Sequence, residues 1–188
     1  TGTSHIGYVG SPTTFNNIIA QGAGTKYFYK DMTINNDLTN QLGSNLYIQP
    51  SVTLTGSGAD NTLTITGGVL YLRGANNFPT GFENISLTGG YVDYYSDDDQ
   101  TVYPTTYYNL RLRRVNEDSS TTKTLSGDIA VKGYLQVYDV ETMLDVADHT
   151  VTLTGNLYFP TGGRQIEWGT GTLIKDGNGW GIDADITG

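Results

Sequence analysis

Residues 63–72 read LTITGGVLYL, and residues 85–94, which begin 22 positions later, read ISLTGGYVDY. Each copy consists of a strand that alternates apolar and small polar residues, a Gly-Gly corner and a second strand. Self-similarity at a short fixed period is typical of solenoids, in which each repeat packs only on its neighbours. The pattern therefore predicts an all-β protein, an elongated, right-handed parallel β-solenoid (β-helix) with coils of about 22 residues and inserted loops.

Looser copies of the same phrase occur at residues 52–56 (VTLTG), 124–127 (TLSG) and 151–155 (VTLTG). The copies are unevenly spaced, as expected where loops are inserted between coils. Within each predicted strand, the alternation with period two assigns one face to the core. The side chains expected to point inward are Leu63, Ile65, Ile85, Leu87, Leu110, Leu112, Ile129, Val131, Leu135, Val137, Val151 and Leu153.

The composition favours strands over helices. The chain of 188 residues contains 14 Tyr and 25 Gly but only two Met, which is the balance of an all-β protein. One short stretch is an exception. Residues 15–20 follow helix-capping residues, and a short helix is considered there. We expect a single domain over residues 1–188, a fragment of a longer protein, in which segments 1–30 and 162–188 either cap the solenoid or form coils whose pattern has drifted.

Charge and cysteine content narrow the classes of partner. The formal net charge of −9 and the pI near 4.4 argue against nucleic acid, because nucleic-acid modules usually present a clustered basic face. No stretch approaches the roughly 20 apolar residues that span a bilayer, so no membrane span is expected. The chain has no cysteine, which excludes disulfides and a cysteine nucleophile. Nothing in the sequence indicates an oligomeric state.

One longer phrase runs through three consecutive segments, YYNLRL at residues 107–112, TKTLSGDIAVKGYLQV at 122–137 and HTVTLTGNL at 149–157. The phrase resembles the repeats of very large secreted surface proteins of Bacteroidetes-type bacteria. The resemblance covers about residues 107–160, with weaker echoes over 46–95. It implies an extracellular or cell-surface, adhesin-like β-solenoid, and it transfers no catalytic residue.

Aromatic side chains are the main candidates for a binding surface. They fall at or beside outward positions or in the C-terminal segment, and exposed rings would suit the apolar faces of sugar rings. The alternative is structural, because tyrosine is a good strand residue that stacks on its copy in the next coil. The candidate ligand-binding residues are Tyr71, Tyr91, Tyr95, Tyr134, Tyr138, Tyr158, Trp168 and Trp180.

The densest charge is the run Asp97, Asp98 and Asp99. Oxygen-rich acidic loops suit calcium, and calcium is the one cofactor considered. The alternative is a solvated loop tip between strands. The chain shows no recognisable nucleophile, general base or phosphate-binding motif, so the sequence predicts no enzyme.

Three hypotheses for the function follow. The first is an extracellular structural or adhesive segment of a large bacterial cell-surface protein, which attaches to surfaces or to polymers such as polysaccharides. The second is a carbohydrate-binding module that uses exposed aromatic rings. The third is a solenoid enzyme acting on polysaccharides, which would need a cleft with paired carboxylates.

Overall fold

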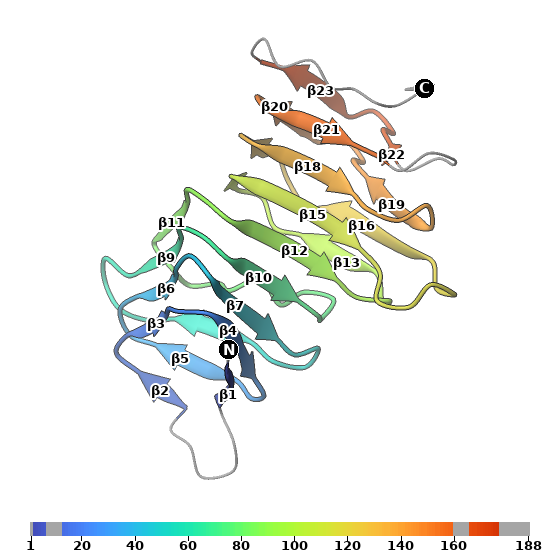
Figure 1. Cartoon of the computed structure of the whole chain (residues 1–188). Helices are drawn as coiled ribbons and strands as arrows, with labels where there is room; N and C mark the ends of the chain where they lie inside the picture. The colour runs from blue at the N-terminus through green and yellow to red at the C-terminus, as the bar shows by residue number, and fades with distance from the viewer. Residues whose placement is uncertain (1, 7–12, 160–165, 177–188) are drawn as a thin grey trace. The chain divides into compact units, whose positions relative to one another are not determined.

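The computed structural model describes residues 2–6, 13–159 and 166–176. Every regular element in these ranges is a β-strand (Figure 1). The chain divides into two compact units, Thr1–Val92 and Asp93–Gly188, and each is described by its ladders of stacked strands. The single domain expected from the sequence stays a prediction.

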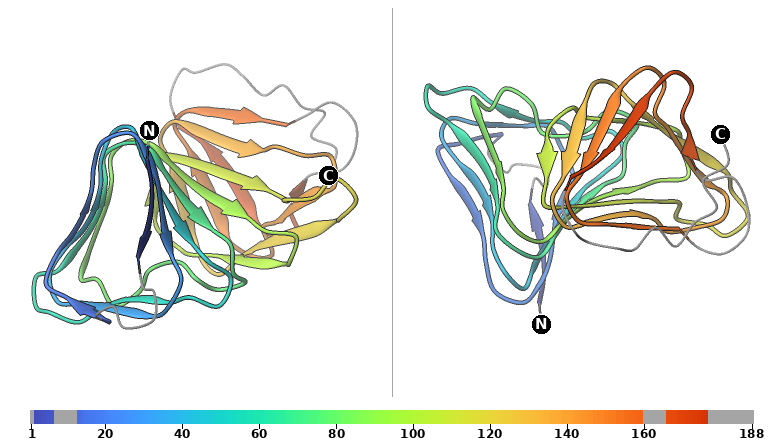
Figure 2. Two further views of the ribbon diagram at one scale, coloured as in Figure 1. Left: turned by 60° about the horizontal axis from the view of Figure 1, so that its bottom comes forward. Right: turned by 90° about the horizontal axis from the view of Figure 1, so that it is seen from above.

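The first unit is built from three ladders, in which strands one coil apart lie side by side. The ladders comprise β1 (Gly2–Ile6), β4 (Gly24–Phe28), β7 (Ser44–Ile48) and β10 (Val69–Leu72); then β3 (Ile18–Ala20), β6 (Leu38–Asn40), β9 (Thr62–Ile65) and β11 (Asn84–Leu87); and β2 (Thr14–Phe15), β5 (Met32–Ile34) and β8 (Leu54–Gly56). In Figure 2 the coils of each unit are seen stacked around an interior of their own.

The second unit repeats this plan with three further ladders. They comprise β12 (Tyr91–Tyr95, which starts at the end of the first unit), β15 (Asn109–Arg113), β18 (Tyr134–Val137) and β21 (Asn156–Tyr158); then β13 (Gln100–Val102), β16 (Thr121–Leu125), β19 (Thr142–Asp145) and β22 (Ile166–Glu167); and β14 (Thr106–Tyr107), β17 (Ile129–Val131), β20 (Thr150–Leu153) and β23 (Thr172–Lys175).

The register confirms the predicted solenoid. Leu63 pairs in parallel with Ile85, and Val151 pairs with Leu173, each 22 positions along the chain. Other pairs lie 20 positions apart, as Gly24 and Ser44 do, or 25 apart, as Leu110 and Leu135 do. The longer steps contain the inserted loops.

The predicted core column is also confirmed. Eleven of the twelve side chains expected to point inward are buried, and Ile85 is half-buried. Ile85 lies on β11, the outermost strand of its ladder, so no further strand of that ladder covers it. Each coil thus contributes aliphatic side chains to a column that adjacent coils share.

The strand pairing corrects one local expectation. The helix considered over residues 15–20 does not form, because this stretch contributes to β2 and β3, and Ile18 pairs with Leu38. Its β-branched residues alternate between a buried and an exposed position, which suits a strand. The caps considered for segments 1–30 and 162–188 stay a prediction. Within these segments, β1 pairs with β4, and β23 pairs with β20.

The Gly-Gly corners are required by geometry. Gly68 has φ +67°, and a Cβ placed on it would lie 1.8 Å from the carbonyl oxygen of Ser44 in the preceding coil. Gly90, its counterpart one coil later, has φ +65° and approaches the carbonyl oxygen of Gly68. Only glycine adopts this conformation and also fits beneath the neighbouring backbone.

Candidate functional site

A row of stacked rings, here called the tyrosine row, lies on the outward face of the ladder formed by β1, β4, β7 and β10. Its members are His5, Tyr27, Tyr47 and Tyr71, which are register partners on consecutive strands. The ring centroids are 5.7 Å apart for His5 and Tyr27, 5.0 Å for Tyr27 and Tyr47, and 4.0 Å for Tyr47 and Tyr71. Parallel, in-register pairing places equivalent side chains directly above one another, so the stacking follows from the fold.

This stacking limits what the tyrosine row offers to a ligand. The rings face their neighbours, so the ring edges and hydroxyl groups are what remains for a ligand to meet. A sugar stacks on the face of an aromatic ring rather than on its edge. For Tyr71 the geometry favours the structural alternative.

In the second unit, three exposed tyrosines form what we call the tyrosine patch. Tyr134 and Tyr138 lie on and just after β18, and Tyr158 lies on β21, with exposed fractions of 44%, 51% and 43%. The two-residue period of the strand places Gln136 on the same face, between Tyr134 and Tyr138. Gln136 is also the register partner of Tyr158. The tyrosine patch therefore combines exposed ring surface with an amide group at its centre.

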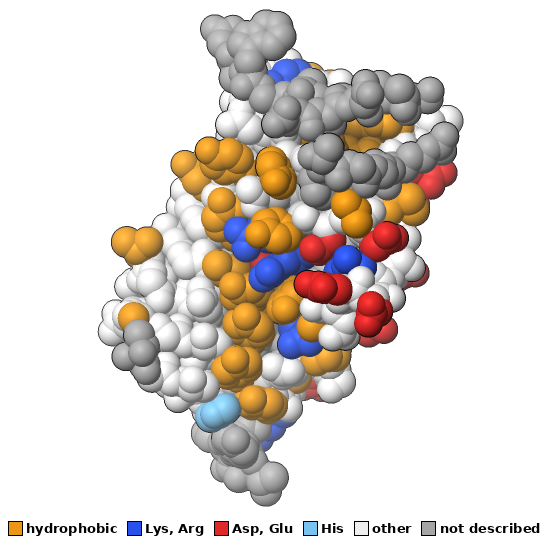
Figure 3. All heavy atoms as spheres, turned by 45° about the vertical axis from the view of Figure 1, so that its right-hand side comes forward, with side chains coloured by type: hydrophobic (Ala, Val, Ile, Leu, Met, Phe, Trp, Pro, Cys, Tyr) orange, Lys and Arg blue, Asp and Glu red, His pale blue; other side chains and the backbone are white. Residues whose placement is uncertain are grey.

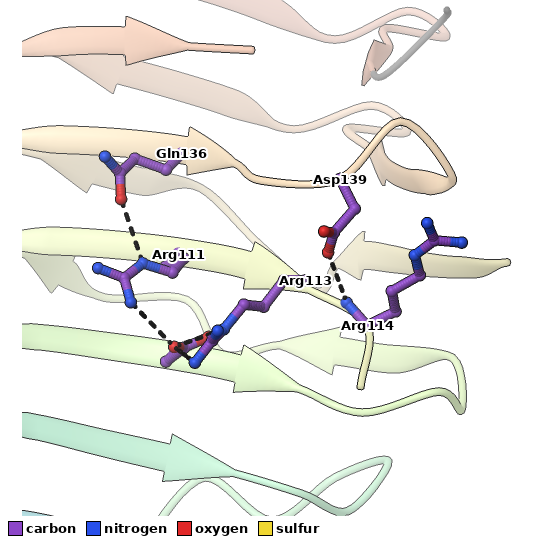
Figure 4. Close-up of polar contacts among 6 residues, drawn as sticks. Arg111, Arg113, Arg114, Gln136 and Asp139 are labelled. Carbon is purple, nitrogen blue, oxygen red and sulfur yellow. Dashed lines mark hydrogen bonds and ion pairs between the residues drawn. The ribbon is translucent and has the colours of Figure 1, made fainter. Parts of the chain in front are cut away.

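A charged cluster borders the tyrosine patch (Figure 4). Asp93 on β12 has no exposed side-chain surface, and Arg113 Nε donates to both of its carboxylate oxygens at 3.2 and 2.9 Å. Arg111 lies 3.4 Å from the same carboxylate, and its Nε donates to Gln136 Oε1 at 3.2 Å. Burial raises the pKa of Asp93, and the two guanidinium groups oppose this rise.

The arginines link the cluster to the rings around it. The Arg113 guanidinium lies 4.1 Å from the centroid of the Tyr95 ring, and that of Arg111 lies 5.9 Å from the Tyr138 ring. Such contacts contribute roughly 0.5–1 kcal/mol each at exposed sites. Figure 3 shows hydrophobic and basic side chains intermixed on this side of the molecule. The cluster fixes the strands beneath the tyrosine patch and places two cations opposite one carboxyl group.

The structure brings together only some of the aromatic residues predicted from the sequence. Tyr134, Tyr138 and Tyr158 share one surface, whereas Tyr71 belongs to the tyrosine row and Tyr95 stacks with Arg113. The remaining three are scattered, with Tyr91 half-buried at the start of β12, Trp168 half-buried after β22, and Trp180 outside the described residues.

Sequence reasoning missed the other members of the tyrosine row and the whole charged cluster. Tyr27, Tyr47 and Tyr71 are separated by 20 and 24 positions, close to the coil length, and this spacing was a usable signal. The burial of Asp93 had no comparable signal, because outward positions of a strand usually face solvent.

The Asp97–Asp99 run organises the loop that follows β15. The Asp97 carboxylate accepts hydrogen bonds from the backbone N–H groups of Val115 and Asn116, each at 2.8 Å, from the Asn116 side chain, and from Ser119 Oγ at 2.6 Å. Although burial opposes the effect, these hydrogen bonds lower the pKa of Asp97. Across residues 2–6, 13–159 and 166–176, no three His, Asp or Glu side chains are grouped as a metal site requires. Calcium binding at this run stays a prediction.

A buried lysine lies behind the same run. Lys123 on β16 has no exposed surface, and its Nζ donates to the carbonyl oxygens of Ser96 (2.9 Å) and Asp98 (3.2 Å) and to Gln100 Oε1 (2.7 Å). Burial lowers the pKa of Lys123 to about 8, although the nearby aspartates oppose this. The alternation that places Leu125 inward also places Lys123 inward, so the pattern contained this information.

Comparisons with protein-family models, with curated proteins and with solved structures gave no match. The described residues contain no helix long and apolar enough to cross a membrane.

Proposed function

We propose that the chain is an extracellular structural and adhesive β-solenoid segment of a large bacterial cell-surface protein, which attaches to polysaccharides or other cell-surface polymers. The observation that carries the proposal is the tyrosine patch on a parallel solenoid. Three rings that are 43–51% exposed stand on adjacent strands of one ladder, where burial in the core does not require them. The proposal assigns no catalytic residue.

The inward and outward faces of the strands have different roles, which supports the proposed function. The inward side chains stabilise the coils, at roughly 1.5–3 kcal/mol for each buried aliphatic side chain before the entropy of folding is subtracted. The outward side chains remain available for contact with a partner. A polymer that repeats along its length suits a surface made of strands that repeat from coil to coil.

The test is retention of the whole chain by a panel of insoluble polysaccharides and bacterial cell walls, at low and high salt and with and without a chelator. Ring stacking depends little on charge, so retention should persist near 1 M salt, where the Debye length is about 3 Å. Retention that disappears at high salt would exclude stacking as the mechanism. Retention that requires the metal would support calcium at the Asp97–Asp99 run.

A carbohydrate-binding module is the second candidate, favoured by the amide of Gln136 between the rings. A module of this kind binds short soluble oligosaccharides at a defined stoichiometry, because a few rings and polar groups are enough to recognise a few sugars. Titration calorimetry with oligosaccharides of the retained polymer separates the two candidates. Saturable binding favours the module, whereas retention of the polymer without oligosaccharide binding favours the adhesive segment.

A further inference from the structure

Gln100 and Lys123 are register partners on consecutive coils of the second unit. Gln100 lies on β13 and Lys123 on β16, and both side chains point into the interior, with 2% and 0% of their surface exposed. The Lys123 amine lies 2.7 Å from Gln100 Oε1. A buried primary amine thus lies against a buried carboxamide, and no water separates the two groups at this distance.

We propose that these two side chains react with each other to form an isopeptide cross-link between adjacent coils. The new bond joins Lys123 Nζ to the side-chain carbonyl carbon, Cδ, of Gln100, and the bond from that carbon to Nε2 of Gln100 breaks. The neutral amine carries two protons, of which one stays on the new amide nitrogen and the other leaves with Nε2 as ammonia. No oxidant, reductant or other co-reactant is needed.

The surroundings hold the amine beside its target. Besides the carboxamide, Nζ donates to the carbonyl oxygens of Ser96 and Asp98, which both belong to the chain just before β13. These bonds confine the amine to one side of Gln100. Attack requires an approach of about 3–3.5 Å to the carbonyl carbon, which lies one bond of about 1.23 Å beyond the oxygen already in contact. A groove or solvent path is not needed, because both reactants are supplied by the fold.

The protonation state of the lysine assists the reaction. An ammonium ion is not a nucleophile, and an exposed lysine remains almost fully charged at neutral pH. Burial lowers the pKa of Lys123 to about 8, so roughly a tenth of the amine is neutral one pH unit below that value. The proximity of the two buried groups is the other contribution, because well-oriented intramolecular reactions show very large effective concentrations.

The cross-link would hold two coils together independently of their packing. It closes the chain segment between positions 100 and 123, which restricts the unfolded state as a disulfide does. A chain without cysteine has no disulfide for this purpose. The inference does not depend on the proposed adhesive role.

The experiment is the intact mass of the denatured full chain, after incubation at about pH 9, above the pKa of about 8. The mass is expected to be lower than that of the sequence by one ammonia. After digestion with trypsin, residues 74–111 should remain joined to residues 115–132, with cleavage blocked at Lys123. This digest distinguishes the cross-link from loss of ammonia at an asparagine elsewhere in the chain.

Three variants complete the test. Lys123→Met and Gln100→Leu should each restore the full mass, because each removes one reactant. Lys175→Met should keep the deficit, since Lys175 Nζ donates to a backbone carbonyl oxygen rather than to a carboxamide. A wild-type chain that keeps its full mass after the incubation, or whose peptides separate, overturns the proposal without any assumption about how the variants fold.

Discussion

At the scale of the residue, the fold depends on which side of a strand each side chain occupies. Leu135 and Tyr134 are neighbours on β18, yet Leu135 is 1% exposed and Tyr134 is 44% exposed. The two residues therefore separate the contribution of the core from that of the outward face.

Leu135→Asp should destabilise the protein by about 4 kcal/mol or more, because it places a carboxyl group in the apolar column. Tyr134→Ser should change the free energy of unfolding by no more than about 0.5–1 kcal/mol. Urea unfolding followed by circular dichroism measures both values. Equal losses of stability would mean that the inward and outward faces are exchanged.

Asp97 is the residue on which the loop after β15 depends. Asp97→Asn should lower the free energy of unfolding by about 1 kcal/mol, since hydrogen bonds to a charged group are strong but this one lies in a partly exposed loop. Trypsin should also cleave faster after Arg114. Asp98→Asn is the matched control. Asp98 accepts hydrogen bonds from Thr121 and Lys123 with its backbone carbonyl oxygen, which the substitution keeps.

The pH dependence of Asp97 has a defined sign. Its pKa is lower in the folded protein than the ordinary 3.8, so its stabilisation is complete above pH 3.8 and is lost as the pH falls through the folded value. Acid unfolding curves of the wild type and of Asp97→Asn should converge at low pH. Curves that stay apart by the same amount at every pH would show that the charge of Asp97 does not stabilise the loop.

At the scale of the element, the corners decide how strands follow one another. Gly68 joins β9 to β10 with a positive φ, and the carbonyl oxygen of Ser44 occupies the place of a Cβ. Gly22 has nearly the same conformation, with φ +70°, but no atom lies within 4 Å of a Cβ placed on it. The pair separates backbone strain from a steric clash.

Gly22→Ala should lower the free energy of unfolding by about 1–2 kcal/mol, because alanine is strained in a left-handed conformation. Gly68→Ala should cost clearly more, because the neighbouring coil must also move away from the added methyl group. The midpoints of thermal unfolding of the two variants give the comparison. Equal costs would show that the coils are not packed as closely at this corner as the structure has them.

The sequence was sufficient to predict the elements but not all of their alignment. Alternation identified Leu63, Ile65 and their counterparts as core residues because the strand period is invariant. The register could not be derived in the same way, because the steps between coils vary from 19 to 25 residues with the loops. For this reason Tyr134, Tyr138 and Tyr158 were identified as candidates, but their proximity was not.

At the scale of the whole molecule, the chain forms two compact units with the same internal plan. Each has three ladders of strands and an apolar column within them, and the exposed rings stand outside that column. A binding role placed on the outward face is compatible with a stable core, because the exposed rings are not part of the buried column. The burial of Asp93 could not be predicted from the sequence, because its surroundings rather than the alternation make a buried charge tolerable there. The alternation did place Lys123 inward, together with Leu125.

The most direct test of the proposed adhesive function uses the triple variant Tyr134→Ser/Tyr138→Ser/Tyr158→Ser. It measures how strongly the best-binding polysaccharide retains this variant. The control is Tyr108→Ser, because Tyr108 is 42% exposed but lies outside the tyrosine patch. The triple variant should fold normally and bind the polysaccharide about 30-fold more weakly, because the loss of ring stacking removes about 2 kcal/mol of binding free energy. The control should bind as the wild type does. A folded triple variant that is retained as well as the wild type would contradict the proposal that this surface attaches to polymers.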